Sequence, residues 1–205
     1  PAMCKTRLIQ LLHGQVAMGY GLHLFDPAWF ENGAEEDACP TVVPGAGKAR
    51  IHGLADVCAD DALWLIPAIA EYLRETGEMA FLWQTVPFAD GGYASVYEHM
   101  KRALDFSFAQ TGAHGVCKGL RADWNDWLNL GGGESAMVAF LLLWAVEHFC
   151  AVARAAGHDL DAAEYENRAE AMKAICRREL WDGGWFLRCI TGKGKPIGTQ
   201  ADREG

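Results

Sequence analysis

The sequence predicts an all-α fold of paired antiparallel helices with a small β-hairpin near its C-terminus. Five segments repeat apolar residues at the period of about 3.6 that is typical of amphipathic helices, and no strands alternate with them. Of the 205 residues, 51% are apolar, which is enough to fill a core without disulfides or metals. An α/α barrel is one architecture of this kind, and its functional groups lie on loops at one end of the helix pairs.

The first two helices are expected at residues 4–18 and 59–76. The second begins at Asp60 and Asp61, whose carboxylates suit the positive end of a helix, and ends at Gly77 as a C-cap. Its apolar face consists of Leu63, Ile66, Ala70 and Leu73, and that of the first helix consists of Leu8, Leu11, Leu12 and Val16.

Three further helices are expected at residues 95–111, 134–156 and 162–180. A turn at residues 90–92 precedes the first of them, and Gly112 and Gly157 stop the first two. Turn signals at residues 181–186 and 191–194 surround a short strand-like run, which predicts the terminal hairpin. We expect one core that buries the side chains of Leu63, Ile66, Leu104, Phe140 and Leu143.

One long loop and the overall charge limit the possible functions. Residues 20–50 are rich in Gly and Pro, and long loops in compact domains tend to be functional. The net charge is -9 with no basic cluster, which argues against a nucleic-acid partner. The longest apolar run, residues 137–146, is too short to predict a membrane span. Seven cysteines without a CxxC pair favour a reducing cytoplasm, and His99, His114 and His148 have no spacing typical of a zinc site.

The most unusual segment is residues 121–130, Arg-Ala-Asp-Trp-Asn-Asp-Trp-Leu-Asn-Leu, which lacks an amphipathic period. Its indoles can stack on sugar rings while its Asp and Asn side chains bind hydroxyls, and one Asp is then available for acid catalysis. The alternative from these residues alone is a helix-capping loop whose tryptophans fill the core. The glycines at 131–133 lack the Lys of a phosphate-binding loop and are better explained as an entry to the next helix, with Glu134 at its favourable end.

This segment, together with Gly-Glu-Ser at residues 133–135, resembles the signature of glycoside hydrolase family 94 phosphorylases of the cellobiose and cellodextrin type. The similarity covers about residues 50–205, and the other matching motifs lie at residues 59–65, 71–77, 96–106 and 181–188. One departure is Trp127, where the family commonly has Cys. The resemblance implies that the chain is an internal fragment of one (α/α)6 barrel (six-hairpin) catalytic domain, and we expect both ends to continue in a longer protein.

The resemblance also implies the chemistry. Asp126 corresponds to the general acid, and Trp124 to the residue lining the subsite of the transferred sugar. Arg121, Asn125 and Asp123 are expected beside it, with Asp123 mainly a structural neighbour. Inorganic phosphate is the nucleophile and co-substrate, so no second carboxylate, cofactor or metal is required. The product is an α-sugar 1-phosphate, and a homodimer is expected for the full-length enzyme.

Substrate and activity stay open in part. Residues 115–121 and 131–137 look like the cellodextrin branch, which favours cellobiose or cellodextrins; chitobiose or another β-disaccharide is the alternative. A hydrolase on the same barrel would need a second carboxylate, for which Glu134 is the nearby candidate. An inactive carbohydrate-binding fragment is a third hypothesis, and because the family's phosphate ligands follow this segment we expect the isolated chain to be inactive.

Asp60 and Asp61 are expected to cap a helix, with sugar binding as the alternative.

Overall fold

The computed structural model describes residues 1–23, 57–125, 128 and 130–202. Most of the predicted loop at 20–50 and the candidate acid Asp126 lie outside the described residues. The elements, in chain order, are α1 (Ala2–Leu12), α3 (Asp61–Thr76), the 3-10 helix η2 (Met79–Trp83), β1 (Thr85–Pro87), β2 (Tyr93–Ser95), α4 (Val96–Ala109), β3 (Glu134–Ser135), α5 (Ala136–Ala155), α6 (Asp159–Glu179), β4 (Cys189–Ile190) and β5 (Pro196–Ile197).

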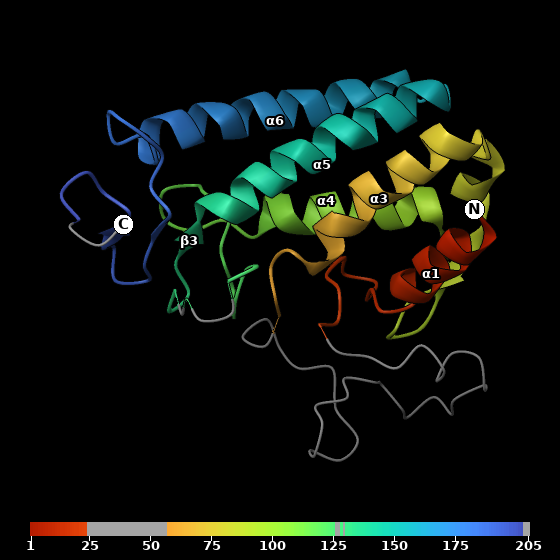
Figure 1. Ribbon diagram of the computed structural model, residues 1–205, viewed down its shortest axis with the longest axis horizontal. Helices are drawn as coiled ribbons and strands as arrows, with labels where there is room; N and C mark the ends of the chain where they lie inside the picture. Colours follow the sequence, from red (N-terminus) through yellow and green to blue (C-terminus); the bar gives the residue numbers. More distant parts are fainter. Residues whose placement is uncertain (24–56, 126–127, 129, 203–205) are drawn as a thin grey trace, which may run out of the picture.

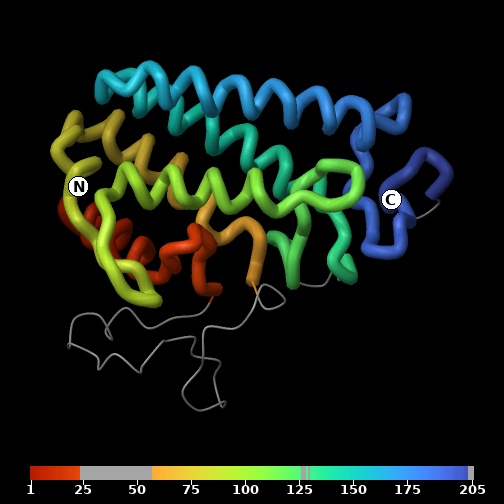
Figure 2. The backbone as a smooth tube through the Cα atoms, turned by 180° about the vertical axis from the view of Figure 1, so that it is seen from behind, coloured from red at the N-terminus to blue at the C-terminus, as the bar shows by residue number. Residues whose placement is uncertain are grey.

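The long helices form a stack in which α5 packs against α6 on one side and α3 on the other. Helix α4 packs against both α3 and α5, and α1 packs against α3. Figure 1 shows α6 at one edge of the stack and α1 at the other. The N-terminus and the C-terminal strands lie at opposite ends of the longest axis, as the reverse view in Figure 2 also shows.

The amphipathic pattern located all five helices. The predicted glycine stops at Gly77 and Gly157 agree with the ends of α3 and α5, but α4 already ends at Ala109, before the predicted stop at Gly112. Helix α3 ends at Gly77, whose φ of 68° is the left-handed conformation expected of a C-cap glycine. Helix α4 starts at the expected place because the Ser95 side chain accepts a hydrogen bond from the backbone N–H of Glu98. Helix α6 starts three residues earlier than predicted, since Asp159 and Asp161 suit its first turn.

The prediction that the first helix extends to Met18 is wrong, because α1 ends at Leu12 and a tight turn follows. The backbone N–H of Val16 donates to the Tyr20 carbonyl, and Gly19 has a φ of 116°. A Cβ added to Gly19 would lie 2.1 Å from the carbonyl oxygen of Arg102 on α4. The turn is therefore fitted against α4, an interaction that the local apolar pattern does not encode.

The strands form two small antiparallel sheets, so the predicted all-α fold with one hairpin is correct only in outline. Strands β1 and β2 make an unpredicted hairpin in the register Val86 to Ala94. The predicted terminal hairpin is β4 and β5, but β3 adds a third strand through the pairing of Ser135 with Cys189. Glu134 was expected inside the next helix and instead lies in this strand.

A single large core joins the helices, and it buries the expected Leu63, Ile66 and Leu104. Leu143 is only partly buried, and Phe140, at 37% exposed, contradicts the prediction. Phe140 lies on a face of α5 that borders an apolar cavity of about 940 Å³. The aromatic residues that line this cavity are Trp64, Phe140, Trp144, Trp185 and Phe186.

Helix α5 is long and apolar enough to cross a membrane by length and composition. However, 61% of its most apolar stretch is buried inside the described structure. It also packs against α3, α4 and α6. These contacts are those of a core helix, for which an apolar surface nearly all round is expected.

Candidate active-site loop

The segment between α4 and β3 contains the residues that the sequence singled out, and its two ends are held together. The backbone N–H of Gly119 donates to the Gly133 carbonyl over 3.0 Å, and Lys118 forms an antiparallel bridge with Glu134. We call residues 119–133 the acid loop. Its closed base places it at the N-terminal end of α5, which begins directly after β3.

The acid loop is also paired with the chain that leads into α3. The Arg121 N–H donates to the Val57 carbonyl over 3.0 Å, and the Ala59 N–H donates to the Ala122 carbonyl over 2.8 Å. Cys58, between them, forms bridges with Leu120 and Ala122. Leu120 adopts a φ of 51° to make this turn, a conformation that is uncommon outside glycine. The loop is thus attached to the N-terminal ends of both α3 and α5.

Asp123 is the buried anchor of the acid loop. Its side chain is 1% exposed and accepts two hydrogen bonds from Nη2 of Arg188, at 2.7 and 2.8 Å. The Ser135 hydroxyl donates to it over 2.5 Å, and the Asn125 N–H donates over 3.0 Å. Burial alone would raise the pKa of Asp123, but the hydrogen bonds from Arg188 and Ser135 outweigh burial and hold it below its ordinary value. Asp123 therefore stays ionised at neutral pH.

Arg188 and Ser135 are essential to this anchor, and neither was assigned a role from the sequence. Ser135 is the N-cap of α5, where its Oγ accepts from the Val138 N–H and from Nη1 of Arg188 while it donates to Asp123. All the hydrogen-bonding capacity of the hydroxyl is used. Arg188 is the last residue of the segment at 181–188 that resembles a family 94 motif, and this position at the end of the motif was the signal that could have identified it.

The neighbouring predicted residues face outward. Trp124 is 73% exposed, and Asn125 and Arg121 are exposed as well. An exposed indole flanked by amide and guanidinium groups suits stacking on a sugar ring together with hydroxyl recognition. Asp126 and Trp127 lie outside the described residues, so the structure places the two sides of the motif but not its centre.

Glu134 was expected to lie at the N-terminal end of the next helix, but it lies in strand β3 with its side chain buried. It is 3% exposed and accepts hydrogen bonds from the N–H groups of His114 and Val116, at 3.0 and 3.1 Å. Its second oxygen lies 2.6 Å from Nδ1 of His114. A Cβ on Gly112 would collide with the Glu134 side chain, so the carboxylate is tightly enclosed by this turn. Its oxygens are committed to residues 112–116 rather than directed at the acid loop.

Asp60 occupies the N-cap position of α3, but its side chain makes no capping hydrogen bond. It is buried and accepts from the indole Nε1 of Trp64 over 2.8 Å. Burial raises the pKa of Asp60. The expectation that the Asp60 side chain caps the helix is therefore wrong, because the carboxylate accepts from the indole of Trp64, one turn further on, instead of from a backbone N–H of the first turn.

His99, whose spacing from the other histidines is not typical of a zinc site, is held by structural partners. It is buried between the Gln15 side chain, 2.5 Å from Nδ1, and the Val86 carbonyl, 3.1 Å from Nε2. Burial lowers its pKa to about 4, so the ring is neutral at physiological pH. It joins the turn after α1 to strand β1. Cys117 and Cys150 are buried in the core.

Comparison with known proteins identifies the family of the chain. The family model described as Glycosyl hydrolase 94 superfamily, catalytic domain, matches residues 1–205. The chain is 53% identical to an N,N'-diacetylchitobiose phosphorylase of Vibrio proteolyticus and 50% identical to one of Vibrio furnissii, over 100% of this chain and 26% of each relative. The chain thus spans about a quarter of the length of these relatives.

Likeness to solved structures extends to the fold at low sequence identity. A GH78 family rhamnosidase of Bacillus sp. GL1 superposes with a TM-score of 0.57 at 21% identity, over 69% of this chain and 14% of that chain. This likeness concerns the helical arrangement and not the chemistry.

Proposed function

Since the chain belongs to the glycosyl hydrolase 94 superfamily through its catalytic domain, we propose that the whole protein is an inverting phosphorylase that cleaves a β-linked disaccharide with inorganic phosphate. The match over the full chain and the relatives at 53% and 50% identity support this reaction class. The product is an α-sugar 1-phosphate together with the released sugar.

The substrate we propose is N,N'-diacetylchitobiose or a close analogue. The sequence motifs alone favoured cellobiose or cellodextrins, but two relatives that share half of all positions with this chain are named as chitobiose phosphorylases. That preference for cellobiose is therefore replaced. A 2-acetamido group differs from a hydroxyl in size and hydrogen bonding, so a site formed for one discriminates against the other.

In this proposal Asp126 is the general acid, and the observation that best supports it is the state of its neighbour. Asp123 is ionised, buried and bound by Arg188 and Ser135, so it is not available to donate a proton. Asp126, three residues further along the same loop, is then the carboxyl group of the Asp-Trp-Asn-Asp motif left for that role. It protonates the glycosidic oxygen while phosphate attacks the anomeric carbon from the other face.

The side chains around Asp126 supply recognition. The exposed Trp124 ring offers a stacking surface, and Asn125 and Arg121 offer hydrogen bonds to hydroxyl or acetamido groups. The structure weakens the alternative of a hydrolase that the sequence left open. Glu134, the candidate for its second carboxylate, is enclosed by the turn at residues 112–116. We further propose that the helices of this chain form part of an (α/α)6 barrel that the rest of the protein completes, and that the phosphate ligands come from that remainder.

The test is an assay of the whole protein on N,N'-diacetylchitobiose and on cellobiose, each with and without phosphate. We expect N-acetylglucosamine 1-phosphate from chitobiose only when phosphate is present, with kcat/KM at least about tenfold higher than for cellobiose. Release of free sugar at the same rate without phosphate would indicate a hydrolase. Preference for cellobiose would restore the expectation from the sequence motifs.

A further inference from the structure

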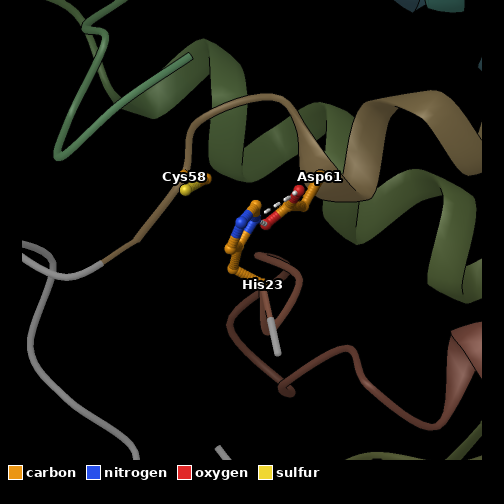
Figure 3. Close-up of side chains that lie close together, drawn as sticks. All are labelled: His23, Cys58 and Asp61. Carbon is orange, nitrogen blue, oxygen red and sulfur yellow. Dashed lines mark hydrogen bonds and ion pairs between the residues drawn. The ribbon is translucent and has the colours of Figure 1, made fainter. Parts of the chain in front are cut away.

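Three potential metal ligands meet beside the base of the acid loop, although they come from different parts of the chain. His23 follows the turn after α1, Cys58 precedes α3, and Asp61 is the first residue of α3. One ligand atom of each lies within 4.8 Å of those of the other two. Figure 3 shows the His23 ring directed at the Asp61 carboxylate with Cys58 beside them.

We propose that His23, Cys58 and Asp61 bind one divalent transition-metal ion of the zinc class. An imidazole, a thiolate and a carboxylate are the ligand types of zinc sites, whereas magnesium and calcium prefer oxygen ligands throughout. Three protein ligands leave the fourth tetrahedral position for solvent. No other group of three such side chains comes together within the described part of the chain.

The spacing of the His23 and Asp61 ligand atoms fits such an ion. Nδ1 of His23 lies 3.2 Å from Oδ2 and 3.3 Å from Oδ1 of Asp61. Zinc bonds of about 2.0–2.1 Å at a tetrahedral angle put a nitrogen and an oxygen ligand about 3.3 Å apart. An ordinary His–Asp ion pair explains this one distance equally well. Such an ion pair, however, gives no reason for the Cys58 sulfur to lie near both the His23 ring and the Asp61 carboxylate, whereas a shared metal ion does.

Burial and access also fit a metal site. Cys58 is 3% exposed, whereas His23 is exposed and Asp61 is intermediate. The sulfur ligand is thus protected while the histidine side remains open to solvent, through which an ion can enter. The Asp61 carboxylate lies in the first turn of α3, at the positive end of that helix.

The position of the site gives the ion a structural role. The backbone of Cys58 pairs with Leu120 and Ala122, immediately before the buried anchor Asp123. A bound ion joins this pairing to α3 and to His23, which is 35 positions away from Cys58 in the sequence. Closing so long a stretch of chain by a metal stabilises the folded form over the unfolded one. The ion therefore stabilises the support on which the acid loop rests.

Cobalt(II) is the probe for the test, because it replaces zinc in such sites and a cysteine thiolate gives it a characteristic charge-transfer absorption. The metal-free whole protein is titrated with cobalt(II), and the charge-transfer band and the bound metal are measured. We expect the wild type to bind one equivalent more than the His23→Gln variant. We expect the thiolate band to disappear in Cys58→Ser. The matched control is Cys4→Ser, on the exposed surface of α1, which should keep the band.

The affinity and a stability measurement distinguish a metal site from an ion pair. Loss of a residue that only hydrogen-bonds to a metal ligand typically weakens binding by about 10- to 100-fold. Loss of His23, a direct ligand, should weaken zinc binding by more than this. Zinc should raise the apparent Tm of the wild type and of Cys4→Ser, but not that of His23→Gln. His23 is exposed, so this variant folds even if Cys58→Ser does not. Absence of the thiolate band in the wild type, or equal metal binding by wild type and His23→Gln, would overturn the proposal.

Discussion

Arg188 donates two hydrogen bonds from one guanidinium nitrogen to the two carboxylate oxygens of Asp123, 65 positions earlier in the chain. The arginine directly precedes strand β4 of the C-terminal sheet, and the aspartate lies in the acid loop. Ser135 connects the pair to the first turn of α5. Three separate segments therefore meet at one buried carboxylate, and the ion pair that joins them depends on its staying charged.

We predict that Arg188→Met destabilises the protein strongly. Removing one partner of a buried ion pair leaves the other charge without compensation, so the free energy of unfolding should fall by about 3 kcal/mol. Urea unfolding of the whole protein at pH 7 measures this. The control is Arg178→Met, because Arg178 is an exposed residue paired with Glu179, and it should change the free energy by less than about 0.5 kcal/mol.

The same variant has a predictable dependence on pH. The pKa of Asp123 is lowered in the folded protein, so its contribution to stability is present above the ordinary value of 3.8 and is lost as pH falls through the folded pKa. Without Arg188, burial raises that pKa instead, and the carboxyl group becomes neutral at a higher pH. The stability difference between wild type and Arg188→Met should therefore shrink as pH falls from 7 toward 4. A constant difference would show that lost packing, not charge, causes the effect.

His99 provides a second dependence on pH, with a window set by its own pKa. Its folded pKa of about 4 lies below the ordinary value of 6.5, so the unfolded chain binds a proton that the folded one excludes. Stability contributed by the neutral ring is complete above pH 6.5 and is lost as pH falls toward 4, by up to about 3 kcal/mol. The decline should be smaller in His99→Gln, which cannot titrate. Unfolding midpoints at pH 7, 5.5 and 4.5 in both proteins test this, and identical slopes would contradict it.

Gly19 tests the packing of the turn after α1 against α4. Gly19→Ala places a Cβ 2.1 Å from the Arg102 carbonyl oxygen at a φ of 116°, so strain and overlap should together cost about 3 kcal/mol or more. Gly91→Ala is the matched control, because Gly91 also has a positive φ, of 99°, but has nothing within 4 Å of the added atom. It should cost only about 1 kcal/mol. Equal losses in the two variants would mean that the turn does not pack as described.

The helices were predictable from sequence because their signals are local. The apolar period, the Ser95 cap and the Gly77 stop involve residues within about one helical turn. The early end of α1 was not predictable, since it results from the approach of Gly19 to Arg102, 83 positions away. The strand at 134–135 was missed for the same reason, because its partner Cys189 lies more than 50 positions further on.

In the candidate site, too, the features set by nearby residues were predictable from sequence, and those set by distant residues were not. The composition of the acid loop and its resemblance to a known family identified Trp124 and Asp126 as candidates, and the structure adds that Asp123 is buried and bound. That result depends on Arg188, which only the folded chain brings to Asp123. Glu134 was misplaced from sequence because a carboxylate before a helix normally faces its N-terminus. Here the strand pairing turns it toward His114 instead.

The decisive prediction concerns Asp126→Asn in the whole protein, which keeps the shape of the side chain but removes the proton that the leaving oxygen requires. General acid catalysis contributes about 10²- to 10⁴-fold, so phosphorolysis should slow by at least about 100-fold, with sugar binding little changed. Its free energy of unfolding should stay close to that of the wild type. Release of sugar 1-phosphate and urea unfolding, measured on the same preparations, give the two values.

Asp123→Asn is the matched comparison, and the structure predicts the opposite pattern. The amide lacks the charge that pairs with Arg188, so the free energy of unfolding of this variant should fall by about 3 kcal/mol. It should therefore unfold at a lower urea concentration than the wild type. Its rate per folded molecule should fall less than that of Asp126→Asn, because Asp123 orders the loop and does not transfer the proton. If both variants lose the same activity and neither loses stability, the division of roles between the two aspartates is wrong.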